Sequence, residues 1–426
     1  MDISYQTSNN KRKPITDINI SNYKKQKLNI QIFYLDDDSL LCILNILQLS
    51  DMLNCSLVNK QFNKVSCSEF YWKRLLDDEF EDKQPHNDYL EEYKLHFTFN
   101  KFVMEALSMN IKEAKKESRI IIQKQKLQFI LPGIKLLTNL QKLKLEQSEY
   151  QELSPEICEL TNLQTLELNY NEIRIVSNQI SKLINLTTLN LSNNRLESIS
   201  KEIGQLSNLQ TLNLEFNRLY LIPKEIGQLS KLTELQFRSN NLKTLPNEIG
   251  LMTNLQEIQL CSNKLQTLPQ EIGLLTNLET LILAHNNFNS IQLDVMRLTN
   301  LRKLYYSGNK LESLPSEISL LTNLQCFHLE ENNLCILPWE IGLLANLQEL
   351  FLWQNKLEII PKEIGLLTEL RVLVLSKNRL SSIPNEIKLL TKLCDLSVNN
   401  NKDLRSLPMC CQRVIDWKSK NCFKYY

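Results

Sequence analysis

A single interval constrains this chain more than any other feature. Twelve apolar residues recur every 23 positions between residues 137 and 390. They are Leu137, Leu160, Leu183, Leu206, Leu229, Met252, Leu275, Leu298, Leu321, Leu344, Leu367 and Leu390. Each opens a copy of one repeat, such as LSNLQTLNLEFNRLYLIPKEIGQ at 206–228. A fixed period of this length is typical of stacked units that contact only their neighbours, so it predicts a solenoid in place of separate globular domains.

Each copy carries the pattern L-x-x-L-x-L-x-x-N-x-L, which resembles the typical 23-residue class of the leucine-rich-repeat family. In the copy at 206–228, Leu209, Leu212 and Leu214 predict a short strand whose apolar side faces inward. The resemblance implies an α/β solenoid, the leucine-rich-repeat horseshoe. It says little about function, because such solenoids bind very different partners.

One asparagine position recurs with the repeat and predicts a buried column of amides. Its members are Asn171, Asn194, Asn217, Asn240, Asn263, Asn286, Asn309, Asn332, Asn355, Asn378 and Asn401. The first copy has Ser148 there. An amide can donate to and accept from the backbone of adjacent coils.

Prolines and glycines share two further positions in the second half of the copies. The prolines are Pro223, Pro246, Pro269, Pro315, Pro338, Pro361 and Pro384, and the glycines are Gly204, Gly227, Gly250, Gly273, Gly342 and Gly365. We expect this half to turn the chain back, with glycine supplying a permissive backbone.

The segment at 33–76 does not repeat. It reads FYLDDDSLLCILNILQLSDMLNCSLVNKQFNKVSCSEFYWKRLL, and its apolar spacing predicts short helices. The order of its residues resembles an F-box, although Asp36 stands where that family usually has proline. The resemblance implies docking onto the Skp-type adaptor subunit of a cullin ubiquitin ligase. The residues that it assigns to this helical unit and its docking face are Leu35, Leu40, Ile43, Leu44, Leu57, Val58 and Trp72. The alternative is a plain helical cap on the solenoid.

The sequence therefore predicts a small all-α domain followed by the repeats. The expected organisation is a disordered basic tail at 1–29, an F-box-like helical domain at 30–80, a helical linker at 81–113, a solenoid at 114–408 with a degenerate first copy and twelve repeats, and a C-terminal cap at 409–426.

The residue between the two strand leucines gives a column on the expected concave face. It is polar from Lys144 to Gln259 and turns mostly apolar or aromatic from Ile282 onward. Exposed aromatic clusters mark contact sites, so we expect a protein substrate to bind there, and drift on a weakly constrained surface is the alternative. The candidate substrate-binding residues are Ile282, His285, Tyr305, His328, Phe351, Trp353 and Val374. Glu330, Glu331 and Glu349 surround them and would suit a partner with positive charge.

Catalytic and cofactor motifs are missing from the sequence. There is no phosphate-binding glycine loop or zinc spacing, and the four histidines lie far apart. Cys410, Cys411 and Cys422 suit a cap with free thiols better than a zinc site. We therefore expect no enzyme activity, no cofactor and no metal.

Charge and hydropathy bound the partners and the compartment. The net charge of +1 and the absence of a long apolar run argue against nucleic acid and membrane. Eleven scattered cysteines fit a reducing compartment, so we expect a cytoplasmic protein, or a nuclear one if the basic residues within 11–27 act as an import signal.

These features favour the substrate-recognition subunit of an SCF-type cullin ubiquitin ligase, in which the F-box docks the adaptor and the concave face binds a protein substrate. The alternative is a non-catalytic leucine-rich-repeat signalling scaffold, for example one that binds a small GTPase.

Overall fold

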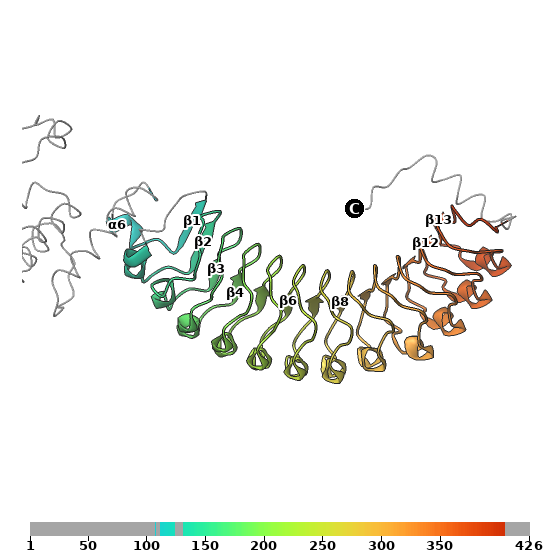
Figure 1. The fold of residues 1–426 in the computed structure, drawn as a ribbon, viewed down its shortest axis with the longest axis horizontal. Helices are drawn as coiled ribbons and strands as arrows, with labels where there is room; N and C mark the ends of the chain where they lie inside the picture. The colour runs from blue at the N-terminus through green and yellow to red at the C-terminus, as the bar shows by residue number, and fades with distance from the viewer. Residues whose placement is uncertain (1–106, 108–110, 124–130, 405–426) are drawn as a thin grey trace, which may run out of the picture. The chain divides into compact units, whose positions relative to one another are not determined.

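The coils of the repeat stack side by side and follow an arc (Figure 1). The computed structural model describes residues 107, 111–123 and 131–404. The chain divides into two units, Met1–Lys94 and Leu95–Tyr426, and all described residues belong to the second. The predicted F-box, its seven docking residues and the C-terminal cap lie outside the described residues.

Within the described residues, each coil contributes one strand to a single parallel sheet of 13 strands in sequence order. The strands are β1 Arg119–Gln123, β2 Lys142–Glu146, β3 Thr165–Glu167, β4 Thr188–Asn190, β5 Thr211–Asn213, β6 Glu234–Gln236, β7 Glu257–Gln259, β8 Thr280–Ile282, β9 Lys303–Tyr305, β10 Cys326–His328, β11 Glu349–Phe351, β12 Val372–Val374 and β13 Asp395–Ser397. Partners lie one repeat apart, as in the pairing of Leu212 with Leu235. The strand of the predicted degenerate first copy joins the same sheet, because Ile120 pairs with Leu143.

The leucine pattern sets the burial of each strand. In β5 the central Leu212 is fully buried, and Thr211 and Asn213 on either side are half-buried. Alternation along a strand explains this, because successive side chains point to opposite faces. The buried leucines of all coils form one continuous core.

In the coils that begin with β1 to β12, the second half forms a short 3-10 helix where the sequence predicted only a turn. A four-residue α-helix, α6 Ile111–Ala114, precedes the sheet. The 3-10 helices are η4 Leu131–Leu136, η5 Ile157–Glu159, η6 Asn178–Lys182, η7 Lys201–Gln205, η8 Lys224–Gln228, η9 Asn247–Leu251, η10 Gln270–Leu274, η11 Leu293–Arg297, η12 Ser316–Leu320, η13 Trp339–Leu343, η14 Lys362–Leu366 and η15 Asn385–Leu389. The shared prolines stand at the N-caps, where φ lies between −64° and −73°. Proline fixes φ in this range, so it starts each helix without strain.

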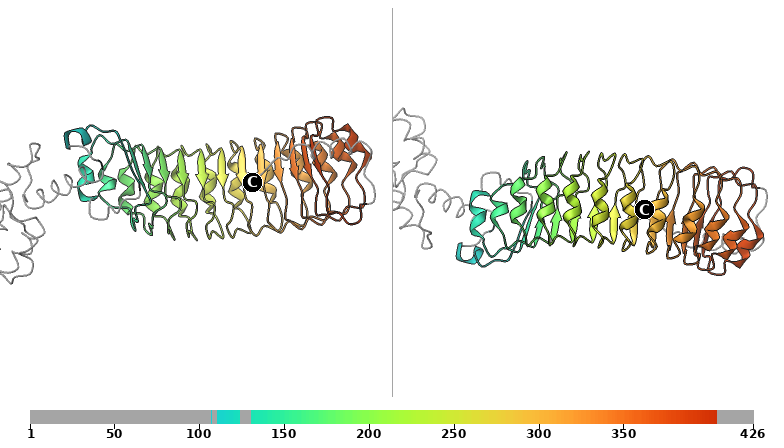
Figure 2. Two further views of the ribbon diagram at one scale, coloured as in Figure 1. Left: turned by 90° about the horizontal axis from the view of Figure 1, so that it is seen from above. Right: turned by 90° about the horizontal axis from the view of Figure 1, so that it is seen from below.

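Strands and helices occupy opposite faces of this unit. Figure 2 shows the strands side by side in the view from above and the 3-10 helices in the view from below. The strands therefore line the concave face, and the helices line the convex face (Figure 1).

The shared glycines do not serve the purpose that the sequence suggested. None of the six has a positive φ, so a permissive backbone is not what they supply. A Cβ added at Gly250 would lie 2.5 Å from the carbonyl oxygen of Glu271 in the next coil. Glycine is needed because adjacent coils approach closely at this point, which corrects the interpretation made from the sequence.

Left-handed backbone occurs instead in the turn after each strand. The residue before each ladder asparagine has a φ between 51° and 62° in almost every coil, as at Phe216, His285 and Lys377. Gly308 is the glycine of this column, and the other members are larger residues that carry some strain.

Candidate functional site

The predicted amide column is confirmed and holds the coils together. Asn263 accepts a hydrogen bond at Oδ1 from the backbone N–H of Leu242 at 3.0 Å. Its Nδ2 donates to the carbonyl oxygens of Phe237 at 2.9 Å and Leu260 at 3.1 Å. The side chain is buried, and the same pattern recurs along the array. In the first coil, the N–H of Ser148 donates to Asn171 instead.

A second asparagine column runs at an exposed edge of the array, and sequence reasoning missed it. Nδ2 of Asn254 donates to the carbonyl of Ser230 at 2.7 Å, one coil earlier. The same bond is made by Asn139, Asn162, Asn185, Asn208, Asn277, Asn300, Asn323 and Asn346. The signal was present, because each of these residues follows the opening residue of its copy by two positions.

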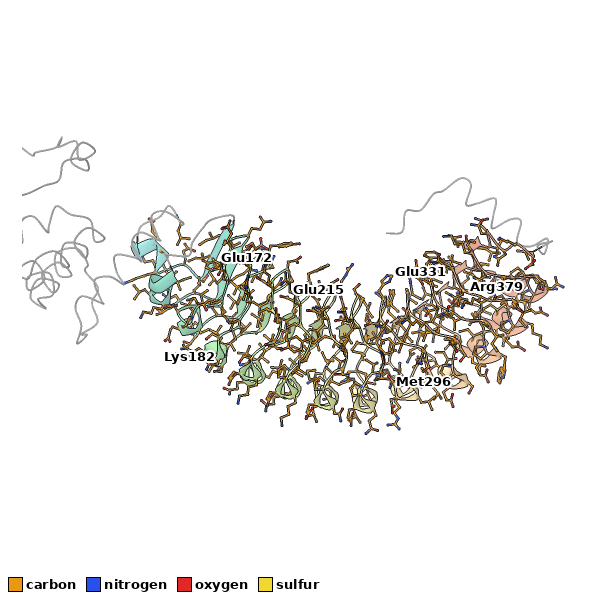
Figure 3. All side chains as sticks on the ribbon, in the orientation of Figure 1. Glu172, Lys182, Glu215, Met296, Glu331 and Arg379 are labelled. Atoms are coloured by element: carbon orange, nitrogen blue, oxygen red, sulfur yellow. The ribbon has the colours of Figure 1, made fainter. Side chains whose placement is uncertain are left out.

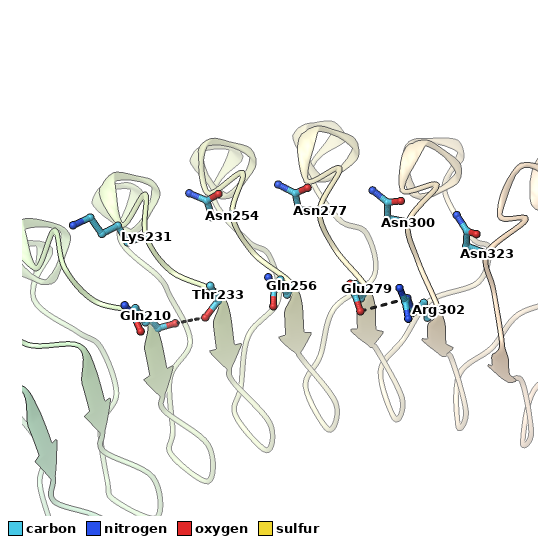
Figure 4. Close-up of a pocket in the computed structure, with 10 residues that line it drawn as sticks. All are labelled: Gln210, Lys231, Thr233, Asn254, Gln256, Asn277, Glu279, Asn300, Arg302 and Asn323. Atoms are coloured by element: carbon cyan, nitrogen blue, oxygen red, sulfur yellow. Dashed lines mark hydrogen bonds and ion pairs between the residues drawn. The ribbon is translucent and has the colours of Figure 1, made fainter.

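A polar groove of about 830 Å³ opens along this edge (Figure 4). Its lining is Gln210, Lys231, Thr233, Asn254, Gln256, Asn277, Glu279, Asn300, Arg302 and Asn323. Many of these groups already bond within the chain: Thr233 donates to the carbonyl of Gln210, and Arg302 lies 3.5 Å from Glu279. The groove is therefore best explained as the outer side of the second asparagine column.

The predicted apolar column on the concave face is brought together by the register of the sheet. Ile282, Tyr305, His328, Phe351 and Val374 end five successive strands, and each pairs with the next. All five are half-buried, because the apolar residues beside them in sequence fill the core. These five residues are called the ridge below.

The rings of the ridge stack on one another. The centroids of Tyr305 and His328 are 4.4 Å apart, with planes inclined by 33°. His328 and Phe351 lie 4.3 Å apart, inclined by 23°. Burial, helped by the nearby Cys326, Glu349 and Glu330, raises the pKa of Tyr305 to about 12. The phenol therefore stays neutral at physiological pH.

The other predicted residues lie beside the ridge. Trp353 follows β11 by two residues, and the Nζ of Lys377 lies 5.1 Å from its ring centroid. His285 is exposed, and its ring lies against Gly308 in the next coil. Trp339 starts η13 on the convex face, outside this site, and is 54% exposed. Figure 3 labels Glu331 on the concave side near these coils.

Glu330 links the ridge to a carboxylate. Its Oε1 lies 3.2 Å from Nδ1 of His328. Its Oε2 is covered and has no hydrogen-bond partner among the described residues. A buried acceptor left without a donor is unfavourable by roughly 1–3 kcal/mol. The site therefore contains a carboxylate oxygen that can accept a hydrogen bond and receives none from the described part of the chain.

The polar end of the concave face is different, because its charges are paired. Nζ of Lys144 lies 2.8 Å from Glu146 and 3.1 Å from Glu167, and Lys142 lies 2.6 Å from Glu167. Asn190 and Asn213 are also occupied, since their Oδ1 atoms accept the backbone N–H groups of residues two positions later. The charges of Lys142, Lys144, Glu146 and Glu167 are therefore neutralised within the chain.

No cluster of three or more His, Cys, Asp or Glu side chains within the described ranges could hold a metal ion. Among the same residues, no helix is long and apolar enough to cross a membrane.

Comparison with known proteins agrees with this architecture. Residues 138–196 match the leucine rich repeat family and residues 174–282 match a leucine-rich repeat region. A leucine-rich-repeat protein of Leptospira interrogans is 35% identical, with 69% of this chain and 80% of that chain covered and a TM-score of 0.57. The chain belongs to the leucine-rich-repeat family.

Residues 32–74 match the F-box domain family, so this is an F-box/leucine-rich-repeat protein. Domains of both kinds are typically non-catalytic protein-interaction modules. No curated protein matches the sequence.

Two further solved structures are similar in fold alone. An internalin from Listeria monocytogenes is 20% identical, with 74% of this chain and 94% of that chain covered and a TM-score of 0.60. The Toll–Spätzle complex of Drosophila gives 24% identity, a coverage of 69% and 42%, and a TM-score of 0.62.

Proposed function

We propose that this chain is the substrate-recognition subunit of an SCF-type cullin ubiquitin ligase. The observation that carries the proposal is the match of residues 32–74 to the F-box domain, ahead of a solenoid that exposes a ring stack on its concave face. The F-box docks the Skp-type adaptor through its apolar residues. The concave face binds a protein substrate through the ridge, Trp353 and His285.

The proposal assigns a different binding partner to each of the two modules. The F-box binds the adaptor of the ligase, and the solenoid binds the substrate. Both modules are needed to place the substrate at the ligase. The leucine core of the solenoid fixes the positions of the concave side chains, since each strand registers with the next. A rigid surface loses little conformational freedom on binding, which favours selective recognition.

Co-purification with a Skp-type adaptor tests this function. The full chain should retain the adaptor, and deletion of residues 30–80 should abolish binding. In the full chain, Ile43→Asp with Leu44→Asp should also abolish it, because charges would enter the apolar docking face. Asn59→Ala, a polar change in the same motif, is the matched control and should bind normally.

The repeats provide a second control. Phe351→Ala with Trp353→Ala should leave adaptor binding unchanged while it weakens the capture of a substrate. Adaptor binding that survives deletion of residues 30–80 would refute the proposal. A chain that captures protein partners but never binds the adaptor would instead be a signalling scaffold.

A further inference from the structure

The ridge presents ring edges, and not ring faces, to solvent. Its centroid separations of 4.3 and 4.4 Å are close to the spacing of about 4.8 Å between neighbouring strands. The rings therefore stand one behind another along the row of strands. Ile282 and Val374 flank the two ends of the row, as the register requires. With its faces covered by neighbours, the stack offers a narrow apolar strip rather than a platform for a stacked base or sugar.

Carboxylates flank this strip on both sides. Glu330 follows His328 by two residues, and Glu349 precedes Phe351 by two. Side chains two positions apart on a strand lie on the same face, so both carboxylates belong to the concave surface. No Lys or Arg within the described part of the chain lies within ion-pair distance of either one.

The bases nearby do not neutralise the two carboxylates. Lys377 lies over the ring of Trp353, and Lys303, at the start of β9, is exposed. At the other end of the face, Lys142 and Lys144 neutralise Glu167 directly. Glu330 and Glu349 therefore keep negative charge that a partner can use beside the ridge.

We propose that the ridge binds a protein segment in which a large apolar side chain lies next to a lysine or arginine. The apolar side chain packs on the ring edges, and the cation reaches Glu330 after a rotation that uncovers Oε2. Glu349 provides the second carboxylate on the opposite side of the strip. The inference rests on the proposed function, in that the concave face receives the substrate, and it adds the chemistry of the segment that is recognised.

Selection of random 12-residue peptides displayed on phage against the full-length protein tests the proposal. Enriched peptides should carry Lys or Arg within two residues of Leu, Met, Phe or Trp. A synthetic copy of an enriched peptide should bind Glu330→Gln about tenfold more weakly, because a charge-assisted hydrogen bond is lost. Its affinity should also fall with added salt.

Glu215→Gln is the matched control, because Glu215 holds the same position of the repeat five coils earlier. It should change the affinity of the peptide less than twofold. Glu330→Gln keeps the shape of the side chain, so its melting temperature should not fall, and unfolding is thereby separated from lost binding. Phe351→Ala should reduce enrichment to background.

Several results would overturn the proposal. They are enrichment of acidic or uncharged peptides, no enrichment above the Phe351→Ala variant, equal affinity for Glu330→Gln, and a concentration-dependent dimer that occupies the ridge and excludes peptide. Adaptor binding is measured on the same preparations. Peptide selection without adaptor binding would refute the ligase function and keep this inference, and the reverse result would refute this inference alone.

Discussion

The imidazole of His328 and the phenyl ring of Phe351 lie face to face, 4.3 Å apart and inclined by 23°. Neither residue belongs to the leucine core, because the buried side chains of their strands are Phe327 and Leu350. Strand register, rather than core packing, brings the two rings together. A stack on a folded surface can be removed without opening the structure beneath it, which makes the ridge accessible to mutation.

Phe351→Ala with Trp353→Ala should abolish capture of a peptide selected on the wild-type protein. Buried aromatic anchors often contribute 2 kcal/mol or more to binding, or about thirtyfold in affinity. Loss of the stack should lower the free energy of unfolding only by about 0.5–1.5 kcal/mol. Anisotropy titrations and denaturant melts measure both. The control, Asn190→Ala with Asn213→Ala, alters the polar half, and equal damage from it would place the partner elsewhere.

Asn263→Leu should lower the free energy of unfolding by about 1–3 kcal/mol for each backbone group left unpaired. The N–H of Leu242 and the carbonyl of Phe237 both lose their side-chain partner. Asn254→Leu provides the comparison, because Asn254 is exposed and bonds only the carbonyl of Ser230, which water can replace. Urea melts in which the two variants shift equally would contradict a structural role for the buried column.

Gly250→Ala should destabilise the protein by about 1 kcal/mol or more, because the new methyl group meets the carbonyl of Glu271 in the next coil. The sign of the change in stability distinguishes close approach of the coils from a need for backbone freedom. If these glycines only supplied backbone freedom, alanine would stabilise the protein by about 0.4–1 kcal/mol through the unfolded state. Ser319→Ala, at the same position of another copy, already has a Cβ and should be nearly neutral.

Alkaline pH should weaken the fold through Cys158. Burial raises the pKa of this thiol from 9.0 to about 12, in part offset by Lys182. Above pH 9 the unfolded chain therefore releases the thiol proton before the folded chain does, and stability falls as pH rises toward 12.

Cys158→Ala should accordingly show a shallower loss of stability between pH 9 and 10.5 in urea melts. Cys335→Ala, which removes an exposed thiol, should keep the slope of the wild-type protein. If the free energy of unfolding falls with pH at the same rate in all three proteins, the pKa of Cys158 is not raised by burial.

The structure of the coils could be predicted from the sequence because the same pattern of leucine and asparagine positions recurs in successive copies. The 23-residue period places Leu212 and its equivalents in the core, and it places Asn263 among backbone groups that need an amide. The row from Ile282 to Val374 also followed from alternation along the strands.

What escaped prediction depends on the neighbouring coil. The need for glycine at Gly250 arises from a carbonyl that is 21 residues away in the chain, so the residue's own surroundings in the sequence suggested backbone freedom instead. The contact of Glu330 with His328 and the covered Oε2 are likewise set by side-chain packing, and the pattern of residue types reveals only that acids are nearby. The seven F-box residues remain a prediction from resemblance.

The strained turn after each strand has a consequence for engineering. Residues such as Phe216, Ser239 and Ser262 adopt left-handed backbone that disfavours them by about 1 kcal/mol relative to glycine. The position recurs from coil to coil, so one stabilising replacement can be copied along the array. The melting temperature should therefore rise with the number of turns in which this residue is replaced by glycine. The residues of the leucine core and of the ridge are left unchanged by these replacements.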